Sequence, residues 1–107
     1  MTFEEALPIL KDGGILTRGA WSQNIVIVKQ NNNIVYPDVF PKMTSLPEEA
    51  KALFRERSME HIKYTNQVIK IDTQSGVAKN FIPDWEDIFA TDWNHILLKD
   101  YDRHFYH

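Results

Sequence analysis

Hydrophobic positions near the N-terminus recur with helical spacing. They fall at i, i+3, i+4 and i+7, which places them on one face of a helix: Phe3, Ala6, Leu7 and Leu10. Thr2 and Glu5 have the spacing of a capping box. The sequence Asp-Gly-Gly at residues 12–14 is expected to end the helix. Pro8 conflicts with this pattern, because proline removes a backbone hydrogen bond inside a helix. We therefore predict a helix over residues 3–11 with an irregular or kinked turn at Pro8.

Shorter apolar runs predict β-strands. Residues 24–30 contain a run of β-branched residues, and residues 67–73 alternate apolar with charged positions. The three asparagines at 31–33 tolerate positive φ, so we predict a hairpin that returns along residues 34–36. Ser75-Gly76 predicts a second hairpin, between residues 67–73 and 77–82. Further strands are expected at residues 15–17 and 93–98.

Two more helices are expected. Ser45 and Glu48 repeat the capping-box spacing, which predicts a middle helix that runs to about Glu60. Its apolar side is formed by Leu46, Ala50, Leu53 and Phe54. Asp84 is suited to cap a short helix that extends through Ala90.

These elements predict an α+β fold. We expect an antiparallel sheet of about five strands, with an N-terminal helix, a middle helix and a short C-terminal helix on one side. Such a small sheet keeps one face only partly covered. An uncovered apolar face or edge is usually closed by a second copy, so we expect a homo-oligomer.

Composition and charge narrow the class of protein. With 107 residues, 43% hydrophobic and 25% charged, the chain is expected to form one domain over residues 1–100, followed by a mobile tail at 101–107. The net charge of −3 disfavours nucleic-acid polymers as partners, although it permits one small anion. The chain has no cysteine, no signal-peptide pattern and no apolar run approaching ~18 residues. We expect a cytoplasmic protein without a membrane partner.

Two distant segments carry a recognisable pattern. The first combines F-E-E-A-L at residues 3–7 with a glycine turn and R-G-A-W at residues 18–21. The second is D-x-x-A-x-D-W at residues 87–93. Together, in this order and spacing, they resemble the Thoeris anti-defence 2-like family. The chain departs from that pattern at Phe81, where the family has Trp, at Asp84, where it has Ser, and in a longer, more helical middle at residues 41–62.

The resemblance implies a small phage or prophage protein that acts in the cytoplasm of the host bacterium. It implies a homodimer or homotetramer that works as a sponge: it binds a cyclic nucleotide immune signal, either a cyclic ADP-ribose isomer or a cyclic oligonucleotide, without cleaving it. Such a protein is not an enzyme and needs no catalytic residue, cofactor or metal. A homo-oligomeric protein-interaction module with no nucleotide ligand and a small nucleotide hydrolase are the alternatives.

The chemistry of a nucleotide selects the candidate residues. A purine stacks on aromatic rings, a phosphate pairs with arginine, and ribose hydroxyls donate to Asp or Asn. We therefore predict ligand binding by Arg18, Trp21, Asn24, Phe81 and Asp87, with Trp21 and Phe81 as stacking surfaces and Arg18 as the phosphate partner.

Several of these residues also have a structural interpretation. Trp21 and Trp93 suit the core, Asp84 suits a helix cap, and Arg18 suits a salt bridge. Asp87 has the spacing to form a catalytic carboxylate pair with the aspartate at position 92, but bonds from both to backbone groups are favoured. The four histidines lack the spacing of metal ligands.

Overall fold

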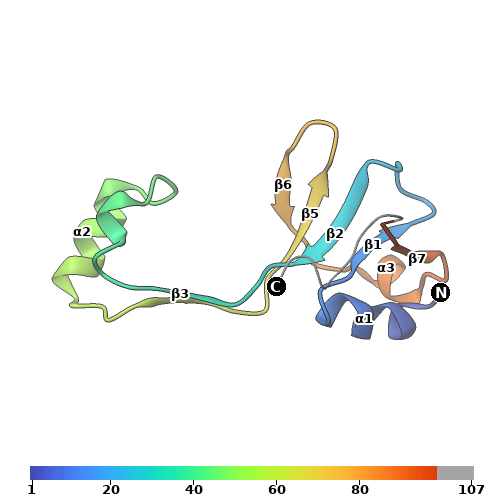
Figure 1. Cartoon of the computed structure of the whole chain (residues 1–107), viewed down its shortest axis with the longest axis horizontal. Coiled ribbons are helices and arrows are strands. Elements are labelled where there is room, and N and C mark those ends of the chain that lie inside the picture. The colour runs from blue at the N-terminus through green and yellow to red at the C-terminus, as the bar shows by residue number, and fades with distance from the viewer. Residues whose placement is uncertain (99–107) are drawn as a thin grey trace. The chain divides into compact units, whose positions relative to one another are not determined.

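Five antiparallel strands form the main sheet, in the order β6-β5-β2-β1-β7 (Figure 1). In the computed structural model, which describes residues 1–98, the elements are α1 (Phe3–Lys11), β1 (Ile15–Arg18), β2 (Ile25–Lys29), β3 (Asn33–Val35), η1 (Phe40–Lys42), α2 (Glu48–Glu56), β4 (Ile62–Tyr64), β5 (Val68–Asp72), β6 (Ala78–Asn80), α3 (Trp85–Phe89) and β7 (Trp93–Ile96). The predicted α+β class is confirmed. The predicted mobile tail at 101–107 lies outside the described residues.

Strand pairing confirms one predicted hairpin and corrects the other. β5 and β6 pair antiparallel across the turn that contains Ser75 and Gly76. The hairpin expected between residues 24–30 and 34–36 is wrong, because β2 pairs with β1 and β5 while β3 pairs with β4. The local asparagine turn signal is overridden by long-range pairing of the more hydrophobic strand β5 with β2.

The chain separates into two compact units at this point. One unit comprises Met1–Gln30 and the chain from Gln67 onward, and the other is Asn31–Asn66. The first contains the five-stranded sheet with α1 and α3. Figure 1 shows both helices on the same side of that sheet, as predicted for these two. The middle helix, which was also expected there, belongs instead to the unit Asn31–Asn66.

The core of the first unit lies between α1 and one sheet face. It consists of fully or almost fully buried residues from α1, β1, β2 and β7: Ala6, Leu10, Leu16, Ile27 and Trp93. Trp93 is 0% exposed, which confirms its predicted core position. Alternation along the strands therefore assigns Leu16, Ile27 and Trp93 to the helix-covered face of the sheet.

The opposite sheet face is also apolar. The register assigns to it six residues that alternate with the core set: Ile15, Val26, Val28, Ile69, Ile71 and Ile96. None of them belongs to the α1-facing core cluster, and all except Val26 are only partly buried. Among the described residues, α1 packs on β1, β2 and β7 from the other side. We refer to this six-residue surface as the open face.

Local signals explain how α1 begins and ends. The predicted capping box is present: Glu5 N–H donates to Thr2 Oγ1 at 3.3 Å and Thr2 N–H donates to Glu5 Oε1 at 3.0 Å. Pro8 lies inside the helix, as the sequence indicated. After the helix, Gly14 passes so close to α1 that a Cβ at this position would lie 2.5 Å from Ile9 Cγ2.

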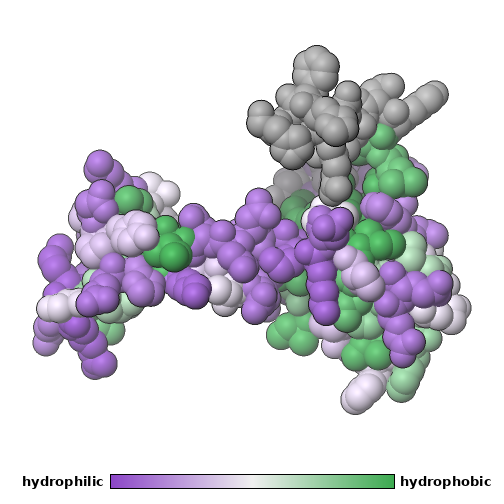
Figure 2. Space-filling view, turned by 60° about the horizontal axis from the view of Figure 1, so that its bottom comes forward, coloured by the Kyte–Doolittle hydropathy of each residue, from purple (hydrophilic) through white to green (hydrophobic). Residues whose placement is uncertain are grey.

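The unit Asn31–Asn66 has its own small cluster of apolar contacts. The rings of Phe40 and Phe54 meet edge to face, with centroids 6.1 Å apart. Lys51 of α2 is buried, and its ammonium donates to Pro41 O at 3.2 Å and to Glu48 Oε1 at 3.0 Å. In Figure 2 the surface of this unit is largely hydrophilic, with a few hydrophobic residues.

Three expectations for the middle helix need correction. Pro47 is the N-cap of α2 and no side chain caps it, so the predicted Ser45–Glu48 box does not form. The helix ends at Glu56 rather than near Glu60, because Ser58 adopts a positive φ of 51° that terminates it. Leu53, expected on the apolar side, is 43% exposed.

The unit Asn31–Asn66 is an insertion between the paired strands β2 and β5. β2 and β5 pair with each other from Ile25↔Asp72 to Lys29↔Val68. Gln30 N–H then donates to Gln67 O at 2.8 Å. The ladder is thus closed at the point where Asn31–Asn66 leaves it, as in a hairpin with an insertion at its tip.

We predict that the first unit folds without this insertion. Replacing Asn31–Asn66 by Asn-Gly, the preferred residues of a two-residue hairpin turn, should preserve the near-ultraviolet circular dichroism of the three tryptophans, which all lie in the first unit. The melting temperature should stay within about 5 °C of the full chain, roughly 1 kcal/mol. A chain that loses its tryptophan signal would show that Asn31–Asn66 is part of the same cooperative structure.

Candidate functional site

Arg18 at the end of β1 holds two carboxylates. Its Nη1 donates to Asp87 Oδ1 at 2.9 Å and its Nε donates to Asp92 Oδ1 at 2.9 Å. The Arg18 and Asp87 side chains are only 9% and 12% exposed, whereas Asp92 is 35% exposed. The arrangement connects β1, α3 and the start of β7, which are far apart in the sequence.

Asp87 has several partners besides Arg18. Its Oδ2 accepts from Asp84 N–H at 3.1 Å, while Asp84 Oδ1 accepts from Asp87 N–H at 2.8 Å, so the predicted Asp84 cap is part of a reciprocal box. The backbone carbonyl of Asp87 accepts the indole N–H of Trp93 at 2.9 Å. The hydrogen bonds with Arg18, Asp84 and Trp93 therefore hold Asp87 in one position.

These bonds shift the ionisation of the groups that make them. The hydrogen bond from Arg18 lowers the pKa of Asp92, with a smaller contribution from Ala20 N–H, which donates to its Oδ2 at 2.9 Å. The hydrogen bond from Asp87 N–H lowers the pKa of Asp84. The hydrogen bond to Asp92 raises the pKa of Arg18. All three groups are thus charged at neutral pH.

An aromatic cluster lies beside the ion pairs. The Trp21 ring meets the Phe81 ring edge to face at 5.8 Å and the Trp93 ring at 5.4 Å. The Arg18 guanidinium carbon is 5.9 Å from the centroid of the Trp21 ring. Lys70 Nζ is closer, at 4.2 Å from the Trp21 centroid and 5.9 Å from that of Phe81. Trp21 thus contacts Trp93 of the core and also forms a partly exposed group with Phe81 and Lys70.

Four of the five predicted site residues come together here: Arg18, Trp21, Phe81 and Asp87. Asn24 is not among their contacts, because its side chain donates to Gln74 Oε1 at 3.2 Å in the neighbouring loop. The alternative interpretation of Arg18 as a salt-bridge residue is found, and Asp87 and Asp92 bond both backbone groups and Arg18. Ligand binding by the five residues stays a prediction.

Lys70 was missed by the sequence analysis. The register pairs it with Ile27, a core residue, so its side chain is on the helix-covered face of the sheet. The alternation of residues 67–73 already carried this signal, since it assigns Lys70 to one face with Val68. A charged residue on a core-facing pattern calls for a partner, and here the partners are aromatic rings.

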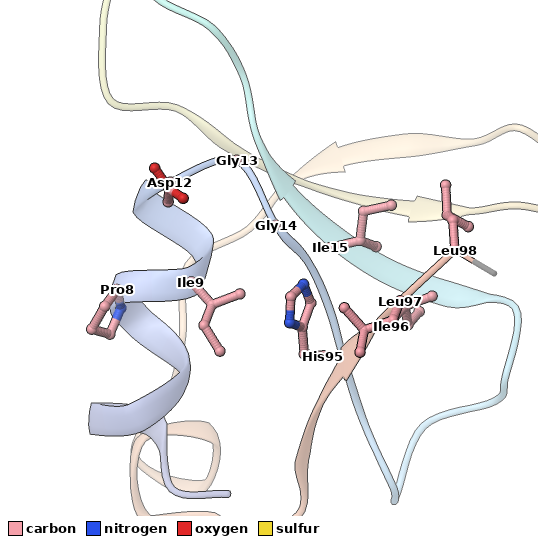
Figure 3. Close-up of a pocket in the computed structure, with 10 residues that line it drawn as sticks. All are labelled: Pro8, Ile9, Asp12, Gly13, Gly14, Ile15, His95, Ile96, Leu97 and Leu98. Atoms are coloured by element: carbon pink, nitrogen blue, oxygen red, sulfur yellow. The ribbon is translucent and has the colours of Figure 1, made fainter. Parts of the chain in front are cut away.

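A hollow lies elsewhere in the first unit. It has a volume of about 810 Å³ and lies between the end of α1, the Gly13-Gly14 turn and residues 95–98 (Figure 3). His95 points into it beside Ile9. The backbone N–H groups of Gly13 and Gly14 donate to Leu10 O and Ile9 O, so they do not form an anion site. Among residues 1–98, no lysine or arginine lines this hollow, so the described lining offers no cation to a phosphate.

Residues 1–98 show neither a metal-binding cluster nor a membrane-spanning helix. No group of three or more His, Asp or Glu side chains in this range is arranged to hold a metal ion. Within the same residues, no helix has the length and hydrophobicity needed to cross a membrane.

The ion pairs predict a specific pH dependence of stability. The pKa of Asp92 is lowered in the folded protein. The ionised carboxylate therefore stabilises the fold above the ordinary aspartate pKa, and this stabilisation is lost as pH falls through the lowered pKa. Asp92→Asn should lower the melting temperature by a few degrees at pH 7, since the amide nitrogen would face a donor on Arg18 or Ala20. The difference from wild type should shrink steadily below about pH 4.

Asp38→Asn is the matched control, because Asp38 is exposed and makes no ion pair among residues 1–98. Thermal melts of the three proteins between about pH 7 and pH 2.5 make the comparison. If the melting temperature of Asp92→Asn stays below that of wild type by the same amount at every pH, the charge of the Asp92 carboxylate does not contribute to stability.

Comparison with known proteins agrees with the resemblance inferred from the sequence. A family model described as the Thoeris anti-defense 2-like domain matches residues 1–96. A search of curated proteins finds no match. The matched range includes Arg18, Trp21, Phe81 and the residues around Asp87. The chain therefore belongs to the Thoeris anti-defense 2-like domain family, and membership of this family implies activity against the Thoeris defence.

Proposed function

We propose that this protein is a non-enzymatic sponge that binds a cyclic nucleotide immune signal in the host cytoplasm and withholds it from the Thoeris defence. The observation that carries the proposal is the group formed by Trp21, Phe81 and Lys70, in a chain of this family. Aromatic rings stack on a nucleobase for ~1–3 kcal/mol each, and an ammonium attracts phosphate. The group thus offers complementary chemistry to both ends of a nucleotide.

The contacts at this group favour holding a ligand over cleaving it. Family members generally act as non-catalytic sponges. Asp87, the nearest buried carboxylate, already accepts from Arg18 and from Asp84 N–H, which makes it a poor general base. In this proposal Arg18 and Asp87 support the position of Trp21, and Lys70 is better placed than Arg18 to meet a phosphate.

The first test of the proposal is recovery of an intact ligand. Cyclic ADP-ribose isomers and cyclic di- and trinucleotides are screened by thermal shift. At 100 Kd a ligand adds about 2.7 kcal/mol of stability. The bound ligand is then released by heating and identified by mass spectrometry. We expect the unchanged cyclic compound in stoichiometric amount. Release of a linear product would favour the hydrolase alternative, and no shift with any compound would refute the sponge.

We propose that a second copy covers the open face. This surface consists of six aliphatic residues on the four adjacent strands β5, β2, β1 and β7, including Val28, Ile69 and Ile71. Five of the six side chains are partly exposed. A contiguous apolar surface of this kind is uncommon in monomers, and a two-fold contact of identical sheets covers it on both copies.

Light scattering tests this assembly. Wild type should give two or four times the chain mass of 12.6 kDa. Ile69→Lys adds a charge to the open face and should reduce the mass at least twofold, with tryptophan circular dichroism unchanged. Ile34→Lys, on the 42% exposed Ile34 of the other unit, is the control and should keep the wild-type mass. A wild-type monomer would contradict the proposal.

One observation favours the alternative of a protein-interaction module. Trp85 and Phe89 of α3 are stacked with centroids 5.5 Å apart, yet they are 70% and 74% exposed, and nearby Ile82 is 78% exposed. Exposed aromatic pairs of this kind are typical of binding hot spots. If Trp85→Ser with Phe89→Ser abolishes anti-Thoeris activity while ligand binding persists, this surface and a protein partner carry the function.

A further inference from the structure

A pocket in the unit Asn31–Asn66 has the size of one aromatic ring. It has a volume of about 150 Å³, and its apolar lining includes Phe40 of η1, Phe54 of α2 and Met59. In an engineered protein, an apolar cavity of about 150 Å³ holds one benzene molecule. The pocket can therefore take one phenyl ring from outside this unit.

The charged residues that line this pocket are both positive. Lys51 and Arg55 are four positions apart in α2, so their side chains lie on the same face of that helix. The buried Lys51 ammonium has three N–H donors and bonds to two acceptors, Pro41 O and Glu48 Oε1. Arg55 is exposed and forms no ion pair among residues 1–98. Since no carboxylate of the described chain lines the pocket, its chemistry favours an occupant with a negative charge beside the ring.

Helix α3 presents this chemistry on the surface of the first unit. The stacked rings of Trp85 and Phe89 are both strongly exposed. Glu86 is exposed too and precedes Phe89 by three positions, so its carboxylate and the phenyl ring are neighbours on one helix face. Residues 80–98 contain no lysine or arginine, and Glu86 forms no ion pair within the described part of the chain. The helix thus offers an exposed phenyl ring with a carboxylate beside it.

We propose that the pocket of one copy receives the Phe89 ring of a second copy, while Glu86 of that second copy meets Arg55. The two surfaces match in size, because the pocket holds one phenyl ring, and in charge, because the pocket lining is basic and the α3 segment is acidic. A two-fold arrangement makes this contact twice, once in each direction. We refer to it as the α3 contact. It uses none of the open-face residues, so it can join two sheet-paired dimers into a tetramer.

Charge reversal on either side tests the α3 contact. Arg55→Glu and Glu86→Arg each place like charges opposite each other and should weaken self-association by at least about tenfold. Phe89→Ala empties the pocket and should act in the same direction. Light scattering over a concentration series should give half the wild-type mass for each variant, with tryptophan circular dichroism unchanged.

Two other charge reversals are the matched controls. Arg57→Glu alters an exposed arginine at the end of α2 that does not line the pocket. Glu4→Arg alters an exposed acid in the first turn of α1, as Glu86 is in the first turn of α3. Both variants should keep the wild-type mass.

A mixture of the two charge-reversed chains shows whether the contact lies between copies. Every contact between the Arg55→Glu chain and the Glu86→Arg chain pairs opposite charges, whereas either chain alone pairs like charges. The mixture should therefore recover the wild-type mass, and native mass spectrometry should find the two chains in equal numbers. One chain that carries both substitutions should also recover it.

The outcomes separate the α3 contact from the open face. If Arg55→Glu, Glu86→Arg and Phe89→Ala all keep the wild-type mass while Ile69→Lys lowers it, the α3 contact is overturned and the open face is supported. If those three variants halve the mass and the mixture restores it, the α3 contact is supported whatever Ile69→Lys does. Recovery in the doubly substituted chain without recovery in the mixture overturns it, as does a wild-type monomer.

Discussion

The rest of the sheet unit depends on the contact of one guanidinium with two carboxylates. Arg18 joins Asp87 of α3 to Asp92 before β7. Asp87 also completes the capping box of α3 with Asp84, and its backbone carbonyl accepts the indole N–H of Trp93. Removal of one partner from such a buried pair leaves an uncompensated charge, which is strongly destabilising. The D-x-x-A-x-D-W segment can therefore be understood as the part of the chain that receives Arg18.

This anchoring determines what the neighbouring surface can do. Because Arg18 is paired with two carboxylates, the cation that we propose to meet a ligand is Lys70, held on the Trp21 ring. Trp21 contacts Trp93 on the core side and Phe81 toward the hairpin, so a rigid core supports the proposed stacking surface. The proposed binding group is thus preorganised by contacts that exist without ligand, which reduces the entropy lost on binding.

Local sequence signals predicted most of this fold. The capping box of α1, the Asp84 cap of α3, the β5–β6 hairpin and buried Trp93 all follow from patterns within a few residues. The predictions failed where long-range pairing decides: the Asn31–Asn33 turn indicated a hairpin, yet β2 pairs across the whole insertion with β5. For the site, residue type selected Trp21 and Phe81. The sequence allowed Arg18 a salt bridge, but it did not reveal which carboxylates are its partners, because they lie 69 and 74 positions away.

The central claim is that a nucleotide binds at Trp21, and the three tryptophans report on it separately. Trp93 is 0% exposed with its indole N–H bonded to Asp87, Trp85 is 70% exposed on α3, and Trp21 lies beside Lys70. Indole N–H signals in a ¹⁵N–¹H spectrum, assigned by Trp→Phe variants, are followed during titration with a cyclic ADP-ribose isomer. The account predicts that the Trp21 signal moves most and saturates, while that of Trp85 stays in place. A titration that moves only Trp85, or none of the three signals, would contradict it.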